Sequence, residues 1–367
     1  MPRLLDRLDA AQRDFRPAAF AVAVWRKAGD DSAGYLSVLI SFYAFLAVFP
    51  LLLVLATVLG LLLRNDPHAQ QSVLHSALSE FPVIGTQLKA NIHSLSGTGF
   101  GLTVGLIGTA WGARGLSAAA QWACNTVWQI PYTRRPNWLH RQGRGLALLA
   151  VIVVDVLANG TLTTVSGVSD GHSLGVEWIG AIVSTLVNAA FFTLGLRLAI
   201  AKEVPVWNFL RAACATAVVW QALLSLGSYL VGHELRHAED LYGVFGIVLG
   251  LITWLNVQAR VTLYLLEADC VRARKLWPRT LDGPKLVPGD LRAFESYAKA
   301  QQRRSSVHIA IDYVDPDGLD GYDGYDGYDG YDGYDGYDEE TSPWSAGTRP
   351  STPSKSTLAA NVPKASP

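Results

Sequence analysis

The chain has 367 residues, of which 50% are hydrophobic and only 17% are charged, and its mean hydropathy is +0.21. These values argue against an ordinary soluble protein, because residues 305–367 are strongly polar and the apolar residues must be concentrated elsewhere. The formal net charge of −1 also hides an asymmetry, since residues 305–367 carry 12 acidic and three basic side chains and the remainder of the chain carries a charge of +8.

Six apolar runs follow one another along the chain, each about as long as a helix that crosses the ~30 Å hydrocarbon core of a bilayer. Most of them lack a polar face, which argues against the alternative of a buried helical core in a large soluble protein. We therefore expect an all-α, polytopic membrane protein with six transmembrane helices. The runs are 38–63, 101–123, 145–166, 175–199, 208–231 and 241–267.

Basic residues gather in alternate connections between the runs, and such residues favour the cytoplasmic side of a membrane. The segment before the first run, the connections after the second and fourth, and the segment after the sixth are all basic. The only basic residues in the intervening connections are Arg64, Lys89 and Arg236. This distribution predicts a multi-pass protein of the plasma membrane with both termini in the cytoplasm.

The first run follows a charged, amphipathic N-terminal segment, residues 1–37, and carries Pro50 near its middle. A proline inside a helix removes a backbone hydrogen bond and kinks or breaks the helix. Broken helices lie beside substrate sites in transporters, although a purely structural kink is also common. Residues 66–97 place apolar side chains at helical spacing, so we expect two short amphipathic helices on the outer surface.

The second and third runs each contain a charged residue, Arg114 and Asp155, at comparable depth. Because an unpaired charge at that depth is costly, we predict an intramembrane ion pair between them. The alternative is that Arg114 extends to the membrane interface and that Asp155 is protonated. The second run also has two G-x-x-x-G pairs, which allow a neighbouring helix to approach closely. Their glycines are Gly101, Gly105, Gly108 and Gly112.

Further polar residues lie within the later runs, including Asn188 in the fourth and Asn256 and Glu267 in the sixth. Such groups face the interior of a helical bundle, where they either join helices by hydrogen bonds or line a wet cavity. The residues that we select as candidates for a substrate pathway are Pro50, Arg114, Asp155, Asn188, Asn256 and Glu267.

Residues 233–237 read His-Glu-Leu-Arg-His and match the H-E-x-x-H pattern of zinc metalloproteases. On one helix His233 and His237 would lie a turn apart and could hold a metal while Glu234 activates water. Glu267 cannot be the third ligand, because it lies about 39 Å along a helix from residue 241, at the opposite membrane face. Other possible ligands on the outer side are His68, His75, His93, His172, Glu239 and Asp240, so a surface metal site stays an alternative. His233 and His237 are therefore weak candidate metal ligands, and an outward-facing zinc metalloprotease is only the third functional hypothesis. We expect no metal, no cofactor and no enzymatic activity.

The remainder of the chain lies outside the membrane domain, which we assign to residues 38–271. Residues 272–304 form a basic juxtamembrane segment, and residues 305–367 form an acidic tail in which D-G-x repeats seven times from Asp317, the last six times as D-G-Y. The repeat lacks the proline that stiffens collagen, and its spacing differs from that of calcium-binding loops. We expect this low-complexity tail to be disordered.

Four parts of the chain together resemble one protein family. They are SFYAFLAVFPLLLVLATVLG at 41–60, WGARGLSAAAQWACNTVWQI at 111–130, VPVWNFLRAACATAVVW at 204–220, and YGVFGIVLGLITWL with LLEAD at 242–255 and 265–269. Their order and spacing resemble the YihY/virulence factor BrkB family of bacterial inner-membrane proteins. The chain departs from the family at RAA (211–213), often Pro-Gly-Ala, and at LLE (265–267), often Gly-Ala-Glu. Matching positions are Ser41, Tyr43, Phe49, Pro50, Trp111, Gly112, Asn125, Pro205, Trp207, Tyr242, Gly243, Trp254 and Glu267.

The resemblance implies a six-span envelope protein of the bacterial inner membrane without an established reaction. The family's older label, ribonuclease BN, is not supported by a cytoplasmic His/Asp cluster or a folded basic domain, so we expect no nucleic-acid partner. Our leading hypothesis is the transport or export of a small solute or lipid, because polar groups at membrane depth are costly unless they are used. The alternative is a non-transporting envelope-integrity or scaffold protein. The expected partners are the lipid bilayer and that solute or lipid, and a homo-oligomer is compatible with the sequence.

Overall fold

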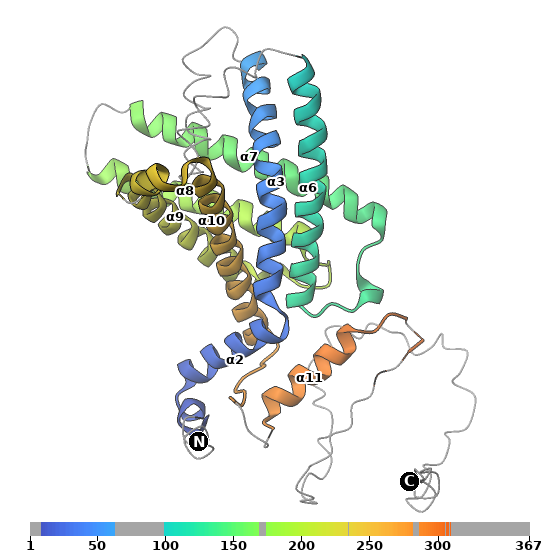
Figure 1. Cartoon of the computed structure of the whole chain (residues 1–367). Coiled ribbons are helices and arrows are strands. Elements are labelled where there is room, and N and C mark those ends of the chain that lie inside the picture. The colour runs from blue at the N-terminus through green and yellow to red at the C-terminus, as the bar shows by residue number, and fades with distance from the viewer. Residues whose placement is uncertain are drawn as a thin grey trace, which may run out of the picture. The chain divides into compact units, whose positions relative to one another are not determined.

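Each of the six apolar runs coincides with one helix in the computed structural model, so the all-α prediction is confirmed (Figure 1). The helices extend beyond most of the runs at their polar ends, because hydropathy marks the apolar part of a helix and not its termini. No strand occurs among the residues that the structure describes, which are 9–62, 99–168, 174–233, 235–281, 286–304, 306, 307 and 309. The six helices are α3 (Ala33–Leu62), α6 (Gly99–Val127), α7 (Trp138–Val168), α8 (Leu174–Ala199), α9 (Leu210–His233) and α10 (Leu235–Ala273).

The chain divides into two units, Met1–Pro316 and Asp317–Pro367. All described residues belong to the first unit. The predicted outer helices of 66–97 and the D-G-Y tail lie outside the described residues. Within the described side chains, Gly180–Ala199 and Val248–Ala273 are each long and apolar enough to cross a membrane, and Arg16–Asp30 with Ala33–Val48 passes the same criterion as a pair bent by 62°. The number of six spans and the cytoplasmic termini stay predictions.

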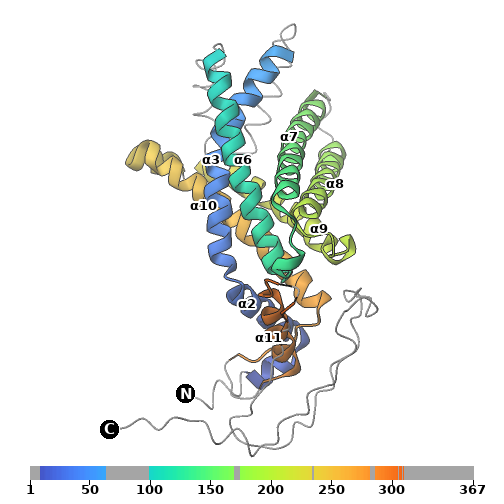
Figure 2. The same ribbon diagram turned by 90° about the vertical axis from the view of Figure 1, so that its right-hand side faces the viewer.

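α3 and α6 run side by side and make the most extensive helix contact of the described fold (Figure 2). Glycines of α6 permit this approach: a Cβ atom at Gly112 would lie 2.8 Å from Ala47 Cα, and one at Gly108 would lie 3.0 Å from Pro50 Cγ. The predicted use of the Gly108–Gly112 pair is thereby confirmed, whereas the side chains around Gly101 and Gly105 lie outside the described residues. α3 continues through Pro50, so the proline does not break the helix and instead packs on Gly108.

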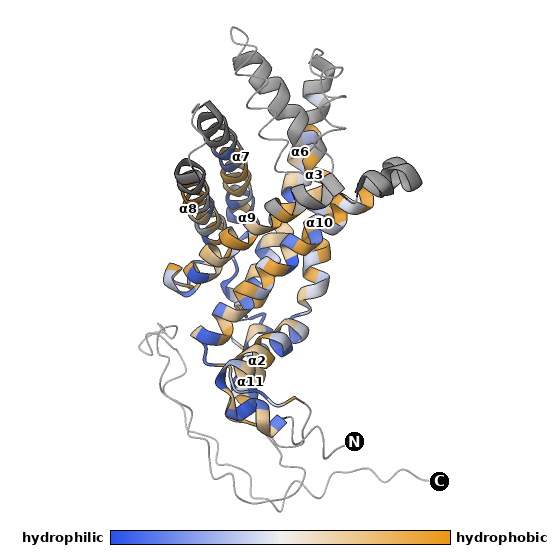
Figure 3. Ribbon diagram, turned by 90° about the vertical axis from the view of Figure 1, so that its left-hand side faces the viewer, coloured by the Kyte–Doolittle hydropathy of each residue, from blue (hydrophilic) through white to orange (hydrophobic). Residues whose placement is uncertain are grey.

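α10 is the central helix of the bundle, because it contacts α3, α6, α9 and the N-terminal helix α2 (Arg16–Asp30). α7 packs on α8 and α6, and α8 packs on α9, which completes the arrangement. The main apolar core lies where the basic ends of these helices meet and includes Trp128, Ile200, Phe209 and Leu266, all 2% exposed or less. Hydrophobic residues are frequent along the described parts of α8, α9 and α10, while α2 carries a mixture of hydrophobic and polar residues (Figure 3).

A second, smaller core joins α2 to the segment after α10 and to α11 (Pro288–Ala300). Ala23, Leu276 and Ala293 are buried in it. Arg279, which precedes α11, donates hydrogen bonds to Asp290 in the first turn of α11 and to Asp30 at the end of α2. Nothing in the hydropathy pattern of 272–304 predicts α11, because the helix is short and polar overall. The local signals are Pro288 at its first position and Asp290 in its first turn, which favour a helix start.

Candidate functional site

The first candidate site is a polar network between α7 and α8. Asn159 Nδ2 donates to Asp155 Oδ1 at 3.0 Å on the same helix and to Asn188 Oδ1 at 3.1 Å on α8. The Asn159 carbonyl oxygen Oδ1 accepts from Ser184 Oγ at 3.0 Å and from Asn188 Nδ2 at 3.3 Å. Asn159 and Asn188 are buried, at 7% and 2% exposed. Asp155 and Asn159 are four residues apart, so helical spacing places both on the face that α7 turns toward α8.

The second candidate site is a cluster of three buried charged residues where α2, the end of α6 and α10 meet. Lys27 Nζ lies 2.5 Å from Glu267 Oε2 and 2.6 Å from Asp31 Oδ2, and it donates to the carbonyl of Val127 at 2.7 Å. Lys27 and Glu267 are fully buried. The carbonyl of Val127 belongs to the last turn of α6, where a cation also favours the negative end of the helix dipole.

Two further polar side chains connect helix ends in the same layer. Asn125 on α6 donates to the Ala199 carbonyl at 3.4 Å and accepts from the Ala201 backbone N–H at 3.0 Å, which ties α6 to the end of α8. Asp269 on α10 accepts from the Ala212 backbone N–H at 2.7 Å in the first turn of α9. Helix ends carry backbone groups without intrahelical partners, so these side chains satisfy groups that would otherwise be unpaired.

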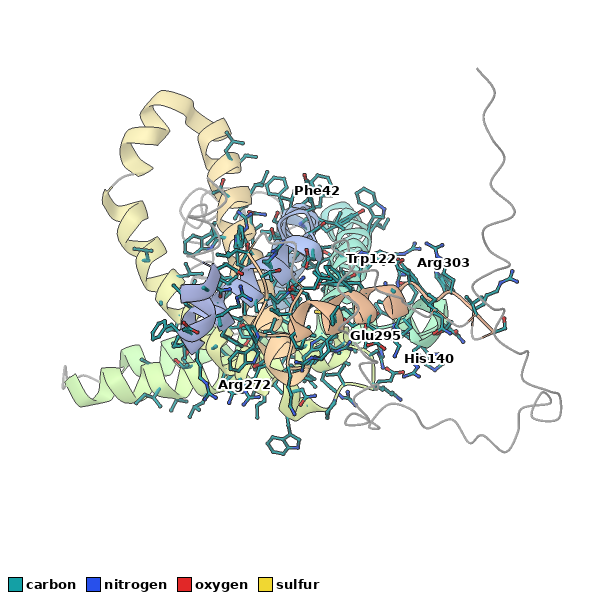
Figure 4. The ribbon with its side chains drawn as sticks, turned by 90° about the horizontal axis from the view of Figure 1, so that it is seen from below. Phe42, Trp122, His140, Arg272, Glu295 and Arg303 are labelled. Carbon is teal, nitrogen blue, oxygen red and sulfur yellow. The ribbon has the colours of Figure 1, made fainter. Side chains whose placement is uncertain are left out.

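Charged side chains lie at the end of the unit that carries α2 and α11. Figure 4, a view from this end, labels the basic residues His140, Arg272 and Arg303 and the acidic Glu295 on α11. Inside it, Arg279 is 2% exposed and donates to Asp290 Oδ1 at 2.9 Å and to Asp30 Oδ2 at 2.7 Å. Burial alone would lower the pKa of Arg279, but the hydrogen bonds to Asp290 and Asp30 outweigh burial and raise this pKa above its ordinary value. Burial also raises the pKa of Tyr297, which donates to Asp30.

The structure brings together only two of the six pathway candidates, Asp155 and Asn188, which are joined through Asn159. Glu267 lies in the charged cluster, and Asn256 Nδ2 donates to Ser37 Oγ at 3.2 Å across the contact of α10 with α3. Pro50 lies against Gly108. These five candidates thus belong to four separate contacts, and among the described residues they do not line one shared pathway.

The predicted ion pair between Arg114 and Asp155 is wrong. Arg114 is exposed on α6, whereas Asp155 accepts a hydrogen bond from Asn159 on α7. Arg114 shares its exposed face with Ile107 and Trp111, both 67% exposed, because residues three and four apart lie on one side of a helix. Equal depth therefore brings these two charges to the same level of the bundle but not to the same interface.

The His-Glu-Leu-Arg-His motif is divided between two helices. α9 ends at His233 and α10 begins at Leu235, so the two histidines do not share the continuous helix that would place them one turn apart. The side chains of His233 and His237 lie outside the described residues. Among the described side chains no group of three or more His, Cys, Asp or Glu residues is arranged to hold a metal ion.

A groove of about 440 Å³ lies between α8 and α9 and includes none of the six pathway candidates. Its walls are apolar or small, with Thr193 and Arg197 as its polar members. The lining residues are Ala189, Ala190, Thr193, Leu194, Arg197, Val206, Leu210 and Cys214.

One family model covers most of the residues that form this helix bundle. The model of the virulence factor BrkB family matches residues 24–286. The chain is a member of the BrkB family. The match begins just before Lys27 and extends beyond Arg279, so it includes the α7–α8 network and the cluster of three charges. No curated protein and no solved structure gives a significant match to the chain.

Sequence reasoning selected Glu267 but missed its two partners, Lys27 and Asp31. A signal was present in α2, where Lys27 follows Ala19 and Ala23 at intervals of four residues and therefore shares their buried face. Ser184 was also missed, since a single serine in an apolar helix carries little signal until its neighbour on the adjacent helix is known.

Proposed function

We propose that this BrkB-family membrane protein transports or exports a small solute or lipid across the bacterial inner membrane. The observation that carries the proposal is the network of Asp155, Asn159, Ser184 and Asn188 between two predicted spans. An acidic side chain and two amides inside apolar helices are costly, and such groups commonly mark a substrate or ion pathway. We also propose that both termini lie in the cytoplasm, on the basis of the basic residues in alternate connections.

A scaffold or envelope-integrity role is the second candidate, and other contacts favour it. Asn256 with Ser37 and Pro50 with Gly108 join neighbouring helices and require no ligand to account for them. Hydrogen bonds between membrane helices contribute about 0.6 kcal/mol on average, which suffices to fix how helices pair. We propose no enzymatic activity, since the metalloprotease motif is divided between α9 and α10.

Water access to the α7–α8 network separates the two roles. Ser184→Cys changes one atom of the network, and we would place it in a background in which Cys124, Cys214 and Cys270 are replaced by alanine. A transport pathway predicts that a small, charged, membrane-impermeant thiol reagent modifies Cys at position 184 in membrane vesicles. Controls are Ala123→Cys, in the apolar core, and Lys202→Cys, on the exposed connection after α8.

The transport proposal expects modification at position 184 at a rate between those of the two controls. A rate as low as that of Ala123→Cys would contradict a water-filled pathway and favour the scaffold role.

The charge itself is tested by Asp155→Asn, which retains a carbonyl oxygen able to accept from Asn159 but removes the acid. Cells with this variant should resemble cells without the gene in an untargeted comparison of solutes and lipids, while the amount of protein in the membrane stays unchanged.

A further inference from the structure

The charged cluster of Lys27, Asp31 and Glu267 has two acids for one base. All three side chains are at least nine-tenths buried, with 0%, 8% and 0% exposure. Lys27 Nζ has three N–H groups, and its partners Asp31, Glu267 and the Val127 carbonyl account for all three. Glu267 Oε1 is buried and receives no hydrogen bond from the described residues.

No second cation in the described structure binds these two carboxyl groups. The other ionisable side chains around the cluster are Cys270 on α10, Arg274 directly after α10, Tyr297 on α11 and Asp30 at the end of α2. Arg274 donates to the Trp128 carbonyl and to Gln129 Oε1. Tyr297 donates to Asp30 and not to the cluster.

Asp31 Oδ2 and Glu267 Oε2 bind the same Lys27 Nζ, at 2.6 Å and 2.5 Å, so these two carboxylate oxygens lie at most about 5.1 Å (2.6 Å plus 2.5 Å) apart. Two carboxylates at such a distance do not both ionise readily, because each raises the cost of charging the other. Burial increases that cost, since a net charge without solvent or a partner is strongly disfavoured. One proton on this pair of acids removes the excess charge.

We propose that Asp31 and Glu267 share one bound proton at neutral pH and form, with Lys27, a neutral proton-binding site at the junction of α2, α6 and α10. The proposal is independent of transport, because it follows from the charges and burial of the cluster alone. The proton is taken from bulk water when the cluster folds. When the proton is released, a single negative charge remains in the contact between α2 and α10, so this contact weakens as the pH rises.

The test is infrared spectroscopy of the full chain in lipid nanodiscs at neutral pH. A protonated carboxyl group has a C=O band that is separate from the bands of ionised carboxylates, and we expect such a band in the folded protein. Labelling the chain with ¹³C-aspartate or with ¹³C-glutamate, in separate samples, shifts the band of whichever acid holds the proton without altering a residue. Unfolding at the same pH should abolish the band, because both acids then ionise in water.

Substitutions assign the band to the cluster. Glu267→Gln and Asp31→Asn each leave one carboxylate for Lys27, and each should remove the band while the protein still unfolds cooperatively. Glu295→Gln and Asp155→Asn are controls, since Glu295 is exposed on α11 (Figure 4) and Asp155 belongs to the α7–α8 network. Both controls should retain the band.

Three results would overturn the proposal. One is the absence of a protonated-acid band in the folded, unsubstituted protein, which would mean that both acids are ionised or that a bound metal cation balances them. Another is a band that survives in both Glu267→Gln and Asp31→Asn. If either variant fails to fold, the isotope shifts of the unsubstituted protein decide, and a band that neither labelled aspartate nor labelled glutamate shifts would equally exclude the site.

Discussion

The contact between α3 and α6 can be tested by adding one methyl group at Gly112. A Cβ atom there would lie 2.8 Å from Ala47 Cα and 3.0 Å from Ala47 N, whereas ordinary contacts of a Cβ atom begin at 3.4 Å. The atoms in the way belong to the backbone of α3, so no side-chain rotation relieves the contact. The two helices must separate by about 0.6 Å, and overpacking of this kind costs ~1–3 kcal/mol.

A matched control measures the opposing effect of helix propensity. Gly195 lies in α8, and a Cβ atom there would meet nothing within 4 Å. Gly195→Ala should therefore be neutral or stabilise the protein by up to ~1 kcal/mol, because alanine favours a helix more than glycine does. Gly112→Ala has the same propensity gain but carries the steric cost, so it should be the less stable of the two variants by ~1–3 kcal/mol.

The assay is thermal unfolding of both variants in the same detergent, followed by intrinsic fluorescence and by the amount of monodisperse protein that remains after heating. Gly112→Ala should unfold at a lower temperature than Gly195→Ala, and Gly112→Leu at a still lower one. Equal unfolding temperatures for Gly112→Ala and Gly195→Ala would refute the close approach of α3 and α6, because the added methyl group would then have met no backbone.

Two further predictions concern α11 and the orientation in the membrane. Arg279→Met breaks a buried pair and should cost ~3–5 kcal/mol of stability, so limited proteolysis should release α11 faster. Lys299→Met removes an exposed pair, and this control should be cleaved at the rate of the unsubstituted protein. Equal cleavage rates for the two variants would show that Arg279 does not hold α11. In the cysteine-free background, Thr133→Cys should react only with reagent on the cytoplasmic side and Arg236→Cys only with reagent on the outer side, and reaction of both from one side would exclude the proposed topology.

The elements of this fold are predictable from the sequence to the extent that they depend on long apolar runs. The six runs coincide with α3 and α6–α10, because a stretch of twenty or so apolar residues has few other stable arrangements. The glycine pair Gly108–Gly112 also predicted a close helix contact, although the partner helix α3 had to come from the structure. Pro50 illustrates the limit, since the residue disfavours a helix interior and α3 nevertheless continues through it.

The polar sites were less predictable, because a side chain's depth and the face on which it lies are separate quantities. Arg114 and Asp155 match in depth, yet Arg114 lies on the exposed face of α6 with Trp111. Asn188 and Asp155 meet only through Asn159, and Glu267 meets Lys27 across 240 residues of sequence. The distance in sequence between such partners carries no signal, since packing of the whole bundle decides which faces meet.

The polar contacts of the described structure differ in a property that bears on function, namely whether their charges balance. Asn256 with Ser37 is a neutral pair, and a neutral pair that joins two helices needs no ion or ligand. The cluster of Lys27, Asp31 and Glu267 contains an excess of one acidic group, and the α7–α8 network contains the acid Asp155 beside two amides. Since the excess acid of the Lys27, Asp31 and Glu267 cluster must be neutralised by a proton or a cation, ion binding is to be sought at this cluster before the neutral contacts.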